Sequence, residues 1–312
     1  MKPRFARICV PVILAAVSAP LGWAQRAARG NFQVESTLVL VNVTVTDARG
    51  QFVTSLGRQD FQVFEDKMPQ TVAYFSSEEA PVSVGLVLDF SRSMAPRFGQ
   101  LKEAVTEFLK SANPEDEFCL IEFRDHAQLS AGFTSEPGTI QNRVAWASPE
   151  GSTALLDAVF LGLHQMRKAR NPRKILLIVS DGGDNHSRYG VREVEDLARE
   201  SDVEIYAIGI GARMRAAYDM WDGPALLSDL TEEAGGRWYE IGNARELPAA
   251  AERIGRELRH EYVLGYVPSN RHRDGRYRHI QVKVPRAPGQ PRLSAYWKHG
   301  YYAPRAEGGF QR

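Results

Sequence analysis

Three oxygen-bearing side chains, Asp89, Ser91 and Ser93, stand at alternate positions where a long apolar run ends. The run, residues 84–88, reads Val-Gly-Leu-Val-Leu, a pattern typical of a strand that is buried on both faces in a parallel sheet. A helical pattern follows over residues 98–109. Because ligands bind where strands end and helices begin in open α/β sheets, we expect the three side chains to be presented together at a binding edge.

Two later segments supply further oxygen atoms. Residues 151–153, Gly-Ser-Thr, form a glycine-led loop before a helical pattern, and a second strand pattern, Lys174 followed by the apolar run 175–179, ends in Ser-Asp-Gly-Gly-Asp. In a doubly wound sheet these loops share the carboxyl edge with Asp89. The resulting set holds carboxylates and hydroxyls but no His or Cys cluster, which favours a hard cation: Mg²⁺ first, with Ca²⁺ or Mn²⁺ as alternatives.

The spacing also indicates what such a cation would do. Ligands at positions i, i+2 and i+4 of a turn that leaves a strand can converge on one ion. If neutral hydroxyls bind it directly and carboxylates act through water, the ion keeps a net positive character. Its open coordination position would then attract an acidic group from another molecule.

The three motifs, D-x-S-x-S at 89–93, G-x-T at 151–153 and S-D-G at 180–182, resemble the metal-ion-dependent adhesion site of von Willebrand factor type A domains. The resemblance covers about residues 82–261 and implies a doubly wound, mainly parallel sheet. It also implies binding of a protein partner that presents an Asp or Glu. The residues that it marks as direct metal ligands are Ser91, Ser93 and Thr153, and those that it marks as acting mostly through water are Asp89 and Asp181.

Two more polar residues are candidates for a supporting role behind these ligands. They are Ser152 and Asp184. Capping of the helix that follows is the favoured explanation of Asp184, because an Asp side chain accepts hydrogen bonds from the free N–H groups of a helix N-terminus.

An enzyme is the main rival class. The sequence contains no G-x-S-x-G, H-E-x-x-H, Walker loop or full G-x-G-x-x-G. A strand-end Asp could act as a phosphoryl-accepting nucleophile, but the second carboxylate expected two residues later is replaced by Ser91. We therefore predict a binding protein and not an enzyme. The alternatives are a metal-assisted hydrolase and a structural module of the cell envelope whose metal only stiffens the loops.

The N-terminal residues 1–24 have the pattern of a secretory signal peptide. A basic start is followed by a short apolar run over 8–19 and by small residues before Gln25. The run is too short and too interrupted by Pro to span a membrane. We therefore expect a secreted, periplasmic or cell-envelope protein with no transmembrane anchor after cleavage.

The rest of the chain divides by hydrophobic period. Residues 31–80 and 262–303 alternate as β segments, and they flank an α/β region over 82–261. Each β segment alone is too small to bury a stable core, so we predict that the two pair into one β-sandwich around the inserted domain. The flanking segments, with Gln59-Asp60-Phe61-x-Val63-x-Glu65-Asp66 before the α/β region and Gly300-Tyr301 after it, resemble a bacterial exported group of type A-related proteins. The composition is 43% apolar with a net charge of +1, which suits a globular core and gives no case for a nucleic-acid partner.

Overall fold

A six-stranded sheet forms the centre of the α/β region. The structure is a computed structural model that describes residues 38–181, 183–210, 223–286 and 289–305, with no side chains described for 223–225. The predicted signal peptide, the start of the first β segment and Gly182 lie outside the described residues.

The strand order of the central sheet is β10-β9-β8-β5-β6-β7, and every neighbouring pair is parallel except the antiparallel edge pair β6–β7. The predicted doubly wound, mainly parallel sheet is therefore confirmed. Every residue of β5 and β9 is buried, as expected for central strands that are covered by helices on both faces. The strand bounds are β5 Val82–Asp89, β6 Glu117–Phe123, β7 Ala127–Thr134, β8 Arg173–Ser180, β9 Val203–Ile210 and β10 Trp238–Ile241.

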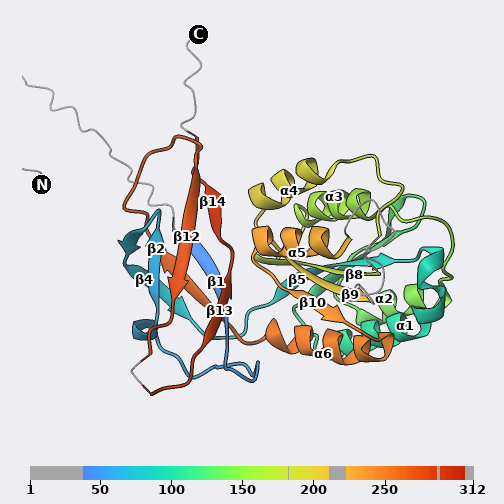
Figure 1. Ribbon diagram of the computed structural model, residues 1–312, viewed down its shortest axis with the longest axis horizontal. Coiled ribbons are helices and arrows are strands. Elements are labelled where there is room, and N and C mark those ends of the chain that lie inside the picture. Colours follow the sequence, from blue (N-terminus) through green and yellow to red (C-terminus); the bar gives the residue numbers. More distant parts are fainter. Residues whose placement is uncertain (1–37, 182, 211–222, 287–288, 306–312) are drawn as a thin grey trace, which may run out of the picture. The chain divides into compact units, whose positions relative to one another are not determined.

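Helices cover both faces of this sheet (Figure 1). On one face lie α1 (Phe98–Leu109), α2 (Pro137–Trp146) and α6 (Leu247–Glu257), and on the other lie α3 (Leu155–Met166), α4 (Val191–Glu200) and α5 (Gly223–Ala234). Short 3₁₀ segments are η1 (Arg58–Asp60), η2 (Arg92–Arg97) and η4 (Ala244–Glu246). Among the described residues, no helix has the length and apolar character that a membrane crossing requires.

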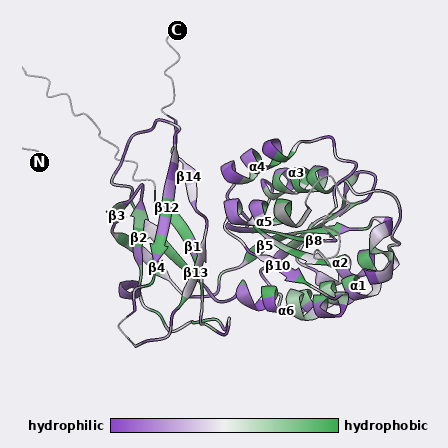
Figure 2. Cartoon of the chain, viewed as in Figure 1, coloured by the Kyte–Doolittle hydropathy of each residue, from purple (hydrophilic) through white to green (hydrophobic). Residues whose placement is uncertain are grey.

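Each face of the sheet packs its own apolar cluster. Along β5, Leu86 and Leu88 enter the cluster beneath α1 and α6, whereas Val87 between them enters the cluster beneath α3. This alternation follows from the two-residue period of a strand. Figure 2 shows the resulting contrast between the hydrophobic central strands and the mixed surfaces of the helices.

Two four-stranded antiparallel sheets make up the flanking β region, in the orders β13-β1-β11-β4 and β14-β12-β2-β3. Strands from before and after the α/β region pair directly, because β1 pairs with β11 and β2 pairs with β12. One apolar cluster takes side chains from both sheets, among them Val43, Val63 and Tyr262. The bounds are β1 Val39–Thr46, β2 Gln62–Glu65, β3 Met68–Gln70, β4 Val72–Ser76, β11 Glu261–Tyr266, β12 Tyr277–Lys283, β13 Ser294–Trp297 and β14 Gly300–Tyr302.

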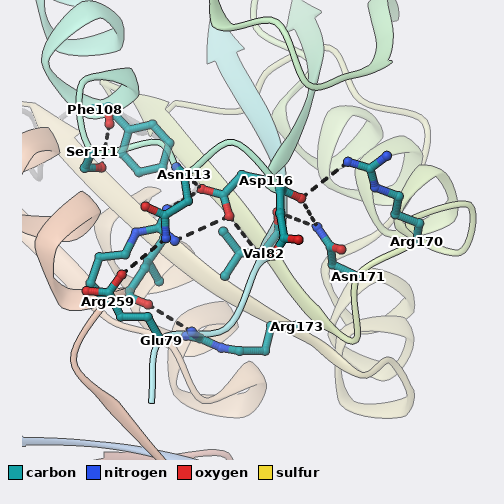
Figure 3. A network of polar contacts seen from close by, with 12 residues as sticks. Glu79, Val82, Phe108, Ser111, Asn113, Asp116, Arg170, Asn171, Arg173 and Arg259 are labelled. Atoms are coloured by element: carbon teal, nitrogen blue, oxygen red, sulfur yellow. Dashed lines mark hydrogen bonds and ion pairs between the residues drawn. The ribbon is translucent and has the colours of Figure 1, made fainter. Parts of the chain in front are cut away.

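A buried polar network holds the amino ends of the central strands (Figure 3). Asp116 is fully buried, and its carboxylate accepts hydrogen bonds from the backbone N–H groups of Val82 (2.9 Å) and Asn113 (2.8 Å). The guanidinium of Arg259, just after α6, pairs with the same carboxylate. These contacts join β5, the loop before β6 and the end of α6, so they fix the sheet at the edge opposite Asp89.

Gly236, which follows α5, lies against the backbone of β9. A Cβ at this position would stand 2.0 Å from the carbonyl oxygen of Ile205. We expect Gly236→Ala to lower the free energy of unfolding by about 2–3 kcal/mol, since backbone and not a flexible side chain must move. Gly242→Ala is the matched control, because a Cβ there meets nothing within 4 Å. Urea denaturation of both variants checks this, and equal unfolding free energies would contradict it.

Candidate functional site

The turn after β5 brings Asp89, Ser91 and Ser93 together. The backbone of Ser91 is extended and its N–H donates to Asp89 Oδ1 over 2.9 Å. Asp89 Oδ2 accepts a hydrogen bond of 2.6 Å from the hydroxyl of Ser180, the last residue of β8. The hydroxyl oxygens of Ser91 and Ser93 lie 2.9 Å apart. The alternate spacing seen in the sequence therefore does place both hydroxyls at one point.

The surroundings of Asp89 destabilise the ionised form of its carboxyl group. It is fully buried, and burial is the main reason why its pKa is raised to about 6. Hydrogen bonds from Ser180 and Ser91 lower the pKa, and the nearby carboxylate of Asp181 raises it. Two neighbouring buried carboxylates repel each other, so positive charge at this edge would offset that repulsion.

The loop that carries Thr153 is fastened to the Asp89 turn by its backbone. The N–H of Arg92 donates to the carbonyl oxygen of Gly151 over 3.2 Å, and the N–H of Glu150 donates to that of Phe90 over 2.8 Å. Gly151 has φ +76°, a backbone conformation that residues with a side chain rarely adopt. A Cβ there would also lie 2.7 Å from the carboxylate of Asp125. Thr153 itself is buried. The glycine thus lets this loop turn beside the Asp89 turn.

A third loop, which follows Asp181, is held to Thr153 from the other side. The carbonyl oxygen of Thr153 accepts from the N–H groups of Asn185 (3.0 Å) and His186 (3.1 Å). In return, the Thr153 N–H donates to Asn185 Oδ1 over 3.0 Å. Asp181, at the end of β8, is buried. The structure therefore gathers the three loops, with all five residues proposed from the sequence, at one edge of the sheet.

The two supporting candidates have other partners. The Ser152 N–H donates to Asp125 Oδ1 over 2.8 Å. Asp184 Oδ2 accepts from the Leu156 N–H over 2.8 Å and from the Ser187 hydroxyl over 2.6 Å. Asp184 therefore caps α3, which precedes it in the chain, and not the helix that follows it.

One residue at this edge was missed by the sequence reasoning. Arg97, at the end of η2, donates from Nη1 to the carbonyl oxygen of Ser93 over 3.0 Å and pairs with Asp181 Oδ2 at 3.3 Å. The available signal was its position four residues after Ser93, because one helical turn brings i and i+4 together. Nothing in the sequence pointed to the contact with Asp181, which is 84 positions away.

The donors suit a hard cation. No group of three or more His, Cys, Asp or Glu side chains is placed to share a metal ion in the part of the chain that the structure describes. The Asp89 edge instead offers two hydroxyls at one point, with a third hydroxyl residue and two carboxylates beside them. Oxygen atoms of this kind, completed by water, are the ligands of Mg²⁺, Ca²⁺ and Mn²⁺.

Residues 84–183 match the family model of the von Willebrand factor type A domain. The match begins in β5 and ends after β8, so it contains the turn at Asp89, the Thr153 loop and Asp181. The type A match thus rests on the same segments that form this edge. Among curated proteins, no sequence matches the chain.

Solved structures resemble this fold. Proximal thread matrix protein 1 from the mussel byssus, in a structure described as having a zinc-occupied MIDAS motif (metal-ion-dependent adhesion site), is 17% identical with a TM-score of 0.51. That alignment covers 62% of this chain and 49% of the mussel protein, about half its length. The conserved hypothetical protein BatB from Bacteroides thetaiotaomicron is 16% identical (TM-score 0.47; 57% of this chain, 97% of that one).

The vWF domain of the type V pili tip protein Mfa5 from Porphyromonas gingivalis is 13% identical, with a TM-score of 0.45. Its alignment covers 57% of this chain and 95% of that domain. At such identities, similarity to solved structures shows the fold alone. The type A domain fold is thus supported by the mussel protein together with the family match, and the chemistry of the site is argued from its own residues.

Proposed function

We propose that the type A domain is a metal-dependent protein-binding module. Its metal ligands are the hydroxyls of Ser91, Ser93 and Thr153, with Asp89 and Asp181 acting through water. The observation that carries this proposal is the convergence of the Ser91 and Ser93 hydroxyls (2.9 Å) beside the fully buried Asp89. The zinc-occupied MIDAS motif of the mussel protein supports a divalent cation in such a fold. Mg²⁺ is the cation that we propose for this chain.

Each group at the proposed metal site would have a distinct role in binding. A bound divalent ion would supply positive charge and an open coordination position. The neutral hydroxyls leave that charge largely uncompensated, while the hydrogen bonds from Ser180 and Ser91 hold Asp89 in one orientation. An Asp or Glu of a protein partner would fill the open position. The chain acts by coordination and not by bond cleavage, and no nucleic acid is involved.

We further propose that the protein works outside the cytoplasm, in the periplasm or elsewhere in the cell envelope, or after secretion. The signal-peptide pattern of residues 1–24 supports this location.

Titration calorimetry with MgCl₂ tests the metal site. Thr153→Val keeps the shape of the side chain but removes its hydroxyl, so we expect at least a tenfold loss of Mg²⁺ affinity, on the order of what removing support for a metal ligand costs. Thr139→Val is the matched control, because Thr139 is exposed on α2. Equal Mg²⁺ affinity in Thr153→Val and wild type would contradict the proposed ligand set.

Melting temperature, turnover and carboxylate binding, each measured with and without metal, separate the rival roles. If the metal only stiffened the loops, chelation would lower the melting temperature and Mg²⁺ would bind without any further affinity for carboxylates. If the site were hydrolytic, wild type would turn over a phosphoester or peptide and Asp89→Ala would not. The binding proposal instead expects carboxylates to bind only when the metal is present.

A further inference from the structure

We propose that Arg97 sets the charge of this site, so that the metal binds less tightly alone and the loaded site selects for a carboxylate. This inference rests on the proposed function and names a residue that the type A resemblance did not mark. Arg97 ends η2, directly before α1. It reaches the site from an element that contributes Ser93 but that is not itself a strand end.

The contacts of Arg97 place its charge at the proposed metal site. Nη1 donates to the carbonyl oxygen of Ser93 (3.0 Å) and pairs with Asp181 Oδ2 (3.3 Å). Both partners belong to loops that carry proposed ligands. The Asp181 side chain is 1% exposed, whereas that of Arg97 is 29% exposed. The guanidinium therefore touches the buried carboxylate on one side and reaches solvent on the other.

The remaining donors of Arg97 are open to a ligand. A guanidinium has five N–H donors in a planar fork, and only Nη1 has a partner in the described part of the chain. A carboxylate that approached the site from solvent could accept from this fork. Charge-assisted hydrogen bonds of this kind are about twice as strong as neutral ones.

The formal charges at the site show how Arg97 would affect the binding of a metal and of a carboxylate. Asp89, Asp181 and Arg97 together carry one net negative charge, so a divalent ion would leave the loaded site with one net positive charge. A single carboxylate would neutralise it. Without Arg97 the loaded site would be neutral, with tighter metal binding and less attraction for a carboxylate. Arg97 thus lowers the affinity of the site for the metal and raises the selectivity of the loaded site for an acidic partner.

Mn²⁺ serves as the probe, since electron paramagnetic resonance counts the free ion and water-proton relaxation counts the waters on the bound ion. We expect Arg97→Gln to bind Mn²⁺ about tenfold more tightly, as a unit charge a few ångströms from a divalent ion, screened as in water, would give. Acetate should displace water from the bound Mn²⁺ at roughly tenfold higher concentration than in wild type.

Two further variants give the controls. Arg167→Gln removes the same charge from an exposed residue at the C-terminal end of α3, the end away from the Thr153 loop, and should behave as wild type. Arg97→Lys keeps the charge, so it should restore the wild-type Mn²⁺ affinity but only part of the acetate affinity. If Arg97→Gln does not fold, this lysine variant still tests the acetate arm, and equal acetate affinity in Arg97→Lys and wild type would overturn the proposal.

The outcomes separate this inference from the proposed function. Mn²⁺ binding that is equal or weaker in Arg97→Gln would overturn the role of Arg97 and leave the metal site standing. Weaker binding would mean that Arg97 only holds the loops together. Absence of Mn²⁺ binding to wild type would overturn the proposed metal site itself, and the role of Arg97 with it.

Discussion

Arg173→Leu is expected to lower the free energy of unfolding by about 3–5 kcal/mol, the usual cost of removing one partner from a buried ion pair. Arg173 begins β8 and its side chain is 8% exposed. It pairs with Glu261 and donates from Nη1 to the carbonyl oxygen of Leu258 over 2.9 Å. Without the guanidinium, the buried Glu261 carboxylate keeps the Tyr206 hydroxyl at 3.1 Å but no longer has this cation beside it.

The controls for this prediction lie close by in the chain. Arg170→Leu removes a guanidinium that is 59% exposed and 3.5 Å from Glu117, so it should cost less than about 1 kcal/mol. The double variant Arg173→Leu/Glu261→Leu should recover much of the loss, because it leaves no unpaired charge. Urea denaturation measures all three variants. A loss below 1 kcal/mol in Arg173→Leu would show that the pair is dispensable.

The second large effect concerns the pH dependence of stability. Burial, and then the negative charge of Glu261, raise the pKa of Glu204 to about 8 from its ordinary value of 4.5. Between these two values the folded state keeps a proton that the unfolded state releases. Stability therefore falls as pH rises from about 4.5 to about 8. A hydrogen bond from Asn42 Nδ2 to the Glu204 carboxylate opposes the rise but does not cancel it.

Glu204→Gln cannot ionise, so it should lose this slope. Near pH 5 we expect the unfolding free energy of the variant to be equal to or below that of wild type. At pH 8 we expect it to be about 2–4 kcal/mol higher, because a pKa shift of this size corresponds to a free energy of that order. Unfolding free energies at pH 5, 6.5 and 8 provide the measurement. The control is Glu103→Gln at an exposed position of α1. Its unfolding free energy should change with pH in the same way as that of wild type. Parallel curves for Glu204→Gln as well would rule out a protonated Glu204.

Both predictions address the amino ends of β8 and β9, whereas the proposed metal site lies at the carboxyl ends. Arg173 and Ser180 stand at opposite ends of the same strand. Changes at Glu204 or Arg173 thus test how the sheet is held together without altering a proposed metal ligand. A variant stabilised at Glu204 would also be a useful background in which to measure weak Mg²⁺ binding.

The sequence by itself determined the sheet and the residue types at its edge. The apolar runs at 84–88 and 175–179 predicted strands buried on both faces, because residues pointing to either face are apolar. The direct pairing of β1 with β11 and of β2 with β12 was predictable because neither β segment has enough apolar residues for a core of its own. The D-x-S-x-S spacing likewise predicted the meeting of the Ser91 and Ser93 hydroxyls.

Only the tertiary structure decided which partners surround these groups. Asp184 caps α3, which comes earlier in the chain, and Arg97 contacts Asp181 across 84 positions. The raised pKa of Glu204 arises from burial beside Glu261, which belongs to the flanking β region. Such contacts join residues far apart in the chain, and local hydrophobic period carries no information about them. They exist because folding brings separate loops and strands to one place, where burial and charge then act on all of them together.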